Sequence, residues 1–92
     1  MYAIKFTSAY KKGYRRMKRR GVDLSLLSDV IETLRQGKQL DRKFRDHILV
    51  GEYVGYHECH IQPNWLLIYL IEDDVLTLTL VKTGTHSDLF DM

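Results

Sequence analysis

The stretch WLLIYLI, residues 65–71, decides the fold, because it is the longest unbroken apolar run in a chain of 92 residues. A strand that is apolar on both faces is typical of the centre of a sheet, where other elements cover both sides. The run is too short to span a bilayer, which needs about 20 residues as a helix. We therefore expect a sheet built around this strand, and no membrane partner.

Three further strands are expected around it. Residues 53–61 read as a strand before it, and residues 75–81 alternate as a strand after a turn at Asp73 and Asp74. The inward side chains of this last strand are expected to be Leu76, Leu78 and Leu80. A short strand over residues 2–6 opens the chain. Its shared face is expected to carry Tyr2, Ile4 and Phe6.

Two amphipathic helices are expected between the first strand and the others. Thr7 or Ser8 can cap the first helix, and Gly21 is placed to end it. Gly13 weakens this helix by about 1 kcal/mol relative to Ala. Its apolar stripe recurs at i, i+4 and i+7 and consists of Tyr10, Tyr14 and Met17.

The second helix follows directly, with Asp23 placed to cap it and Gly37 to end it. Its apolar side is expected to hold Leu24, Leu27, Ile31 and Leu34. Residues 38–49 fit neither period and are expected to be mostly loop. The predicted fold class is α+β, with residues 1–92 as one domain. A small antiparallel sheet is packed by an N-terminal two-helix hairpin, in the order β-α-α-β-β-β with a short C-terminal helical turn.

The net charge of +2 conceals a strong asymmetry along the chain. Residues 1–20 carry eight Lys and Arg and no acidic residue, whereas the rest carries six basic and twelve acidic residues. Separated positive charge can attract a polyanion such as RNA, although a basic helical face is often only solvated. The candidate polyanion contacts on the first helix are Lys11, Lys12, Arg15, Arg16, Lys18, Arg19 and Arg20.

A Glu-x-His pair in the strand over residues 53–61 is a candidate acid–base site. Glu58 and His60 share one strand face at a spacing of roughly 6.6 Å, while His57 and Cys59 share the other. A metal needs three or four converging ligands, and these side chains are divided between two faces. We therefore expect no metal. The alternative for Glu58 and His60 is an ordinary solvated sheet face.

Two more histidines make proton transfer the favoured interpretation. His47 lies in the predicted loop, and His86 directly follows the last strand. Histidine exchanges protons near neutral pH, so three histidines and a carboxylate that converge on one sheet indicate acid–base chemistry. RNA cleavage needs a base for the 2′-OH, an acid for the leaving 5′-oxygen and cations for the charged phosphorane. It requires no cofactor.

Three blocks of the sequence resemble the YafQ branch of the RelE-like bacterial toxins. They are Asp46-His47-x-Leu49-x-Gly51, then Gly55-Tyr56-x-Glu58-x-His60-Ile61-x-Pro63-x-Trp65-x-Leu67-Ile68-Tyr69, then Thr83-Gly84-Thr85-His86-Ser87-x-Leu89-Phe90. The resemblance implies a RelE-like fold and an endoribonuclease that cleaves mRNA in the ribosomal A site. It also implies a cognate antitoxin, with an antitoxin dimer making a heterotetramer. The expected partners are therefore this antitoxin, mRNA and ribosomal RNA.

By position, the resemblance assigns catalytic roles to His47, His60, His86 and the acidic Glu58. Phe90 matches an aromatic residue that positions the substrate. We expect His60 and His86 to be the acid–base pair. Asn64 departs from the family, which often has Asp there, and an amide cannot act as a carboxylate base.

Three alternatives remain open at this point. The chain could be a ParE-like toxin that binds DNA gyrase, a nucleic-acid-binding module without catalysis, or a toxin that has lost its activity. The N-terminus lacks a signal-peptide pattern, and the single Cys59 permits no internal disulfide. We therefore expect a cytoplasmic protein.

Overall fold

The structure is a computed structural model that describes residues 1–90, so two residues of the predicted domain lie outside the described part. Five strands form one sheet in the order β1-β5-β4-β3-β2. The strands are β1 (Ala3–Phe6), β2 (His47–Ile48), β3 (His57–Gln62), β4 (Trp65–Glu72) and β5 (Thr77–Gly84). The helices are α1 (Ser8–Arg19), α2 (Leu24–Arg35) and α3 (His86–Phe90). Single 3-10 turns are η1 (Arg42–Phe44), η2 (Gly51–Tyr53) and η3 (Asp73–Val75). The predicted α+β class is confirmed, and the predicted element order agrees with the structure apart from one additional strand, β2.

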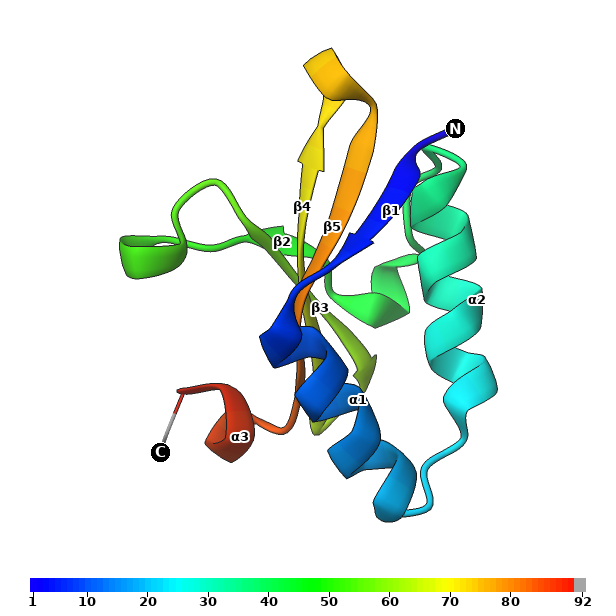
Figure 1. Cartoon of the computed structure of the whole chain (residues 1–92), viewed down its shortest axis with the longest axis vertical. Coiled ribbons are helices and arrows are strands. Elements are labelled where there is room, and N and C mark those ends of the chain that lie inside the picture. The colour runs from blue at the N-terminus through cyan, green and yellow to red at the C-terminus, as the bar shows by residue number, and fades with distance from the viewer. Residues whose placement is uncertain (91–92) are drawn as a thin grey trace.

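The central position predicted for the apolar run is confirmed, because β4 lies between β3 and β5. Its side chains are buried on both faces. Leu67 and Tyr69 join a core cluster with α1 and α2, whereas Leu66 and Ile68 join a second cluster with Leu89 of α3. Figure 1 shows α2 on one side of the strands and α3, after the end of β5, on the other.

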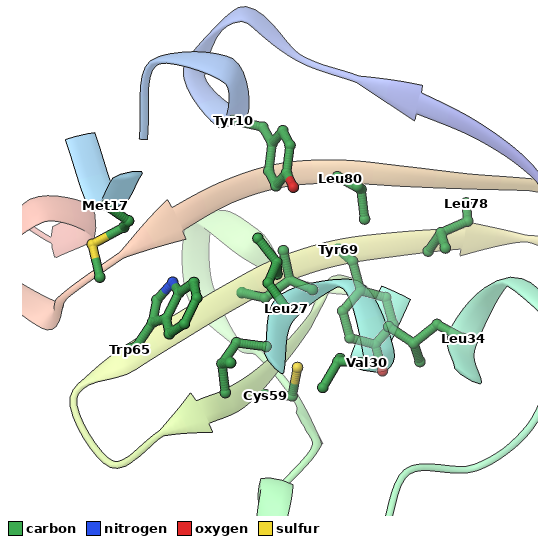
Figure 2. Packing of buried hydrophobic residues seen from close by; sticks show 12 residues of the cluster. Tyr10, Met17, Leu27, Val30, Leu34, Cys59, Trp65, Tyr69, Leu78 and Leu80 are labelled. Atoms are coloured by element: carbon green, nitrogen blue, oxygen red, sulfur yellow. The ribbon is translucent and has the colours of Figure 1, made fainter. Parts of the chain in front are cut away.

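The two-helix hairpin covers one face of the sheet as predicted. Thr7 caps α1 by accepting a hydrogen bond from the Tyr10 amide at 2.9 Å, and Asp23 caps α2 through the Ser25 amide at 3.0 Å. Figure 2 shows the side chains that meet beneath the helices. They include Tyr10, Met17, Leu27, Val30, Leu34, Tyr69, Leu78 and Leu80. Within residues 1–90, no helix combines the length and apolar character needed to cross a bilayer.

Gly13 has a packing role that its low helix propensity did not indicate. A Cβ atom at this position would lie 2.1 Å from the carbonyl oxygen of Thr83. Only glycine allows α1 to approach β5 so closely. The strand that leads to the C-terminal helix is thereby held tightly against α1.

Strand direction, several element boundaries and the orientation of one side chain differ from those expected. The sheet is antiparallel except at its edge, where β1 runs parallel to β5. The strand predicted from residue 53 begins at His57, because η2 precedes it. Leu76 does not face inward. It adopts a left-handed turn conformation (φ 46°) and is 57% exposed. The predicted loop over residues 38–49 contains η1 and ends in β2, a short edge strand that had no strand-like pattern.

Candidate active site

Glu58 lies between two histidines on the face of the sheet that α1 and α2 leave open. Strand pairing places His47 of β2 directly opposite Glu58 of β3. The Nε2 atoms of His47 and His60 lie 3.4 and 3.7 Å from the same Glu58 oxygen, Oε1. Glu58 is only 5% exposed, so Glu58 and His60 do not form an ordinary solvated sheet face. The three side chains form a compact cluster of acid–base groups.

Backbone carbonyls decide which nitrogen of each ring carries the hydrogen. Nδ1 of His47 lies 2.9 Å from the Arg45 carbonyl oxygen, and Nδ1 of His60 lies 3.4 Å from that of Pro63. A carbonyl oxygen only accepts, so both Nδ1 atoms act as donors. This arrangement leaves Nε2 of each ring as the nitrogen that can exchange a proton next to Glu58.

His86 and Phe90 complete the cluster from α3. The His86 ring centroid lies 6.0 Å from that of His60 and 6.2 Å from that of Phe90. His86 thus lies beside His60, as its position after the last strand predicts, and Phe90 lies one helical turn after His86. The short helix also contributes to the core, because Leu89 is 8% exposed and packs with Leu66 and Ile68.

Asp88 fixes the orientation of this short helix. It accepts a hydrogen bond from the Thr85 amide at 2.9 Å and donates its own amide to Thr85 Oγ1 at 3.2 Å, a reciprocal capping arrangement. Arg20 donates two hydrogen bonds to the same carboxylate, and Arg16 lies 3.6 Å from it. The Arg20 guanidinium, together with the Thr85 donors, holds the pKa of Asp88 well below its usual range.

The basic side chains of α1 therefore fall into two groups, those that contact Asp88 and those that are exposed to solvent. Arg16 and Arg20, both predicted to contact a polyanion, are engaged with Asp88 of α3. The other candidate contacts are exposed on the surface of the helix: Lys11, Lys12, Arg15, Lys18 and Arg19. These side chains are the part of the helix available to a polyanion.

The structure adds two residues that the sequence analysis missed. Lys82 Nζ donates a hydrogen bond to the Tyr53 hydroxyl at 2.7 Å. The Tyr53 ring meets the Phe90 ring edge to face, at a centroid distance of 6.2 Å. A cation and a second aromatic ring thus extend the surface that begins with His86. The sequence pattern places Tyr53 in a strand and Lys82 beyond the end of one, so it predicts no relation between either residue and the site.

A cavity of about 430 Å³ opens beside His60. It lies between α2, η1 and the turn after β3. Its lining combines apolar side chains with two cations and consists of Leu26, Asp29, Lys43, Phe44, Arg45, His60, Ile61, Gln62 and Pro63. This volume lies within the usual range for small-molecule pockets.

The other predicted groups do not join the cluster. Cys59 points into the core, where burial raises the pKa of its thiol. His57 stacks on Tyr69 at a centroid distance of 5.1 Å. Among residues 1–90, no set of three or more His, Cys, Asp or Glu side chains is arranged to hold a metal ion.

Known proteins resemble the chain over nearly its full length. Residues 2–91 match a family model described as the bacterial toxin YafQ of type II toxin–antitoxin systems. The mRNA interferase toxin YafQ of Escherichia coli K12 is 32% identical over 88 residues, which cover 95% of this chain and 94% of that protein.

Two solved structures are close in fold. A metal-bound toxin from Helicobacter pylori has a TM-score of 0.92 and 37% identity, with 98% of this chain and 100% of that one covered. YafQ in the E. coli DinJ–YafQ complex has a TM-score of 0.88 and 28% identity, with 98% and 99% covered.

Proposed function

The chain belongs to the YafQ family of bacterial toxins from type II toxin–antitoxin systems, and on that premise we propose that it is an mRNA interferase, an endoribonuclease that cleaves mRNA. The main observation behind this proposal is that Glu58 lies within 3.7 Å of Nε2 of both His47 and His60, and that His86 lies beside His60. A binding module or a ParE-like toxin does not need this cluster of acid–base groups.

We assign the proton transfers to His60 and His86. One of these rings takes the proton of the 2′-OH while the 2′-oxygen forms its bond to phosphorus. The other gives a proton to the 5′-oxygen as the P–O5′ bond breaks. A centroid separation of 6.0 Å supports this assignment, because one phosphodiester group can be flanked by both rings.

Glu58 acts through the histidines. A ring that has accepted a proton carries a positive charge, and a nearly buried carboxylate stabilises that charge at short range. Because Oε1 faces Nε2 of both His47 and His60, it also holds these nitrogens toward the reacting group. His47 contacts the phosphate or shares the proton transfer. This scheme does without the acidic residue that Asn64 replaces.

Aromatic and basic groups around the histidines suit an RNA strand. Phe90, with Tyr53 at its edge, offers a ring on which a base can stack, a contact worth about 1–3 kcal/mol. Lys82 brings a positive charge to Tyr53 and can face the substrate's phosphates. The cavity beside His60 can take a neighbouring nucleotide, with Lys43 and Arg45 close to its phosphate.

We propose that the substrate is mRNA in the ribosomal A site. The exposed cations of α1 would contact ribosomal RNA or the mRNA backbone, a sequence-independent interaction that suits their even distribution along the helix. In E. coli, YafQ forms a complex with DinJ. We likewise propose an antitoxin partner with an acidic segment that folds along this protein, and an antitoxin dimer that makes the complex a heterotetramer.

The related H. pylori toxin is described as metal-bound. The side chains of this chain, as placed, do not form a metal-binding set within the described residues. We propose that the reaction uses side chains alone and takes place in the cytoplasm.

The function is tested by inducing the protein in cells and mapping the 5′ ends of mRNA, with and without a translation block. New 5′ ends within coding regions, lost when translation is blocked, are the expected result. His60→Gln should remove them, while Lys5→Gln on the opposite edge strand β1 should retain them. Unchanged 5′ ends with the wild-type protein would overturn the nuclease proposal.

A further inference from the structure

The edge strand that carries His47 is too short to hold its own position. β2 contains only His47 and Ile48, and these residues are 51% (side chain) and 62% exposed, respectively. One backbone hydrogen bond, from the Leu49 amide to the Tyr56 carbonyl at 2.8 Å, follows the pair. A strand with so few ladder bonds and so little buried surface is expected to fray. The 3.4 Å approach of His47 to Glu58 therefore needs another source of rigidity.

Asp46, directly before this strand, supplies this rigidity. Its Oδ2 accepts a hydrogen bond from the Tyr69 hydroxyl at 2.6 Å, and its Oδ1 lies 3.3 Å from Nδ1 of His57. The His57 ring in turn stacks on the Tyr69 ring, with an interplanar angle of 18°. We call these three residues the Asp46 anchor.

The anchor is attached to the buried centre of the sheet. Tyr69 belongs to the central strand β4, is 1% exposed and packs in the core beside Val30 and Leu34 (Figure 2). Burial, followed by the hydrogen bond to Asp46, raises the pKa of Tyr69. Its hydroxyl group consequently stays protonated and remains a donor throughout the physiological pH range.

Strand alternation connects the anchor to the site. Consecutive residues of an extended segment point to opposite faces of the sheet. Asp46 reaches Tyr69 in the cluster beneath α1 and α2, and His47 faces Glu58 on the open face. A shift of one residue would exchange these two side chains. Fixing Asp46 therefore fixes the register of β2 and the position of the His47 ring.

We infer that Asp46, held by Tyr69 and His57, is a positioning residue that keeps His47 against Glu58 for RNA cleavage. Asp46 lies on the opposite side of the sheet from the reacting groups and acts only through His47. The inference rests on the proposed function for its activity readout, but its structural consequence can be measured without activity.

Tyr69→Phe tests the anchor by removing one hydroxyl group while the ring remains. Tyr10→Phe is the matched control, because it removes a hydroxyl from another buried tyrosine of the same core cluster. Tyr69→Phe should lower kcat about tenfold or more with little change in KM, since small displacements of a catalytic group have effects of this order. Tyr10→Phe should leave kcat unchanged. In a His47→Ala background, Tyr69→Phe should cause no further loss.

A second readout is the imidazole NMR spectrum, in which the His47 signals are assigned by their absence from His47→Ala. Tyr69→Phe should move or broaden these signals, and Tyr10→Phe should not. If Tyr69→Phe does not fold, Asp46→Ala removes the anchor at its partly exposed end. It is then measured in the same way, alone and in the His47→Ala background. Equal losses of activity in both backgrounds, or unchanged His47 signals, would overturn the inference. If His47→Ala cleaves at the wild-type rate, the role of His47 in the proposed function fails, while the NMR result still decides whether the anchor holds β2.

Discussion

Arg20, at the end of the basic helix, donates two hydrogen bonds to Asp88, from Nη1 to Oδ2 at 2.7 Å and from Nη2 to Oδ1 at 3.1 Å. Asp88 belongs to α3, the short helix that carries His86 and Phe90. A paired geometry of this kind fixes direction as well as distance. The helix predicted to bind a polyanion therefore also orients part of the candidate active site.

This relationship predicts that Arg20→Glu lowers cleavage more than Arg19→Glu does. Both variants change the net charge equally, but only the first places a carboxylate against Asp88 and repels α3. We expect a loss of about tenfold or more in kcat for Arg20→Glu, because His86 moves relative to His60. Single-turnover cleavage on ribosomes at saturating concentration measures it. Equal losses for the two variants would contradict the orienting role.

Acid stability should depend on Asp88. Its pKa is lowered in the folded protein, so its ion pair adds stability that is complete above the unfolded-state pKa of about 4. That stability is lost as pH falls through the folded-state pKa. Asp88→Asn should therefore have a lower Tm than wild type near pH 6, and the difference should shrink toward pH 2. Thermal unfolding followed by circular dichroism over this range provides the measurement. A difference that stays constant with pH would disprove the linkage.

His86→Ala is expected to lower cleavage by about 10²–10⁴-fold, the usual contribution of a general acid or base. The fold should remain, because α3 is held by Leu89 and Asp88 rather than by His86. His86→Gln should do no better, since Gln forms hydrogen bonds but does not transfer protons at neutral pH. Cleavage by the Gln variant within a few-fold of wild type would assign His86 to positioning and move the proton transfer to His47 and His60.

The exposed cations of α1 should contribute to binding rather than to chemistry. Charge reversal at Arg15 and Arg19 should weaken ribosome binding and reduce its salt dependence, with kcat at saturation unchanged. Stability should change little, because both side chains are exposed. Binding isotherms at several salt concentrations provide the test. If neither the substitutions nor added salt changes the affinity, the exposed cations of α1 are only solvated and do not bind RNA.

Metal dependence can be decided directly. Cleavage by the purified protein should survive chelation of transition metals, with Mg²⁺ kept for the ribosome, because the histidines suffice for both proton transfers. Added Zn²⁺ or Cu²⁺ should inhibit if it binds the Nε2 atoms of His47 and His60, since these are the nitrogens left to exchange protons. One equivalent of tightly bound zinc in the active protein, with activity lost on its removal, would refute the side-chain mechanism.

The sequence by itself determined the elements whose signals are local. The apolar run of β4, the caps Thr7 and Asp23 and the stripe of α1 each depend on residues a few positions apart, and all are present in the structure. The face shared by Glu58 and His60 followed from the two-residue period of a strand. The placement of His86 followed from its position after the last strand.

Tertiary structure decided what depends on distant neighbours. The stretch around Asp46 and His47 has no strand pattern of its own. It becomes strand β2 only because Tyr69 binds Asp46 and because β3 pairs with it. Arg20 resembles its exposed neighbours in sequence, and only the docking of α3 makes it a structural partner of Asp88. Glu58 is likewise buried in a setting that includes His47 of the neighbouring strand β2, which lies against its carboxylate. Local sequence fixes backbone periodicity, but the exposure and partners of a side chain are set by segments that meet only when the chain has folded.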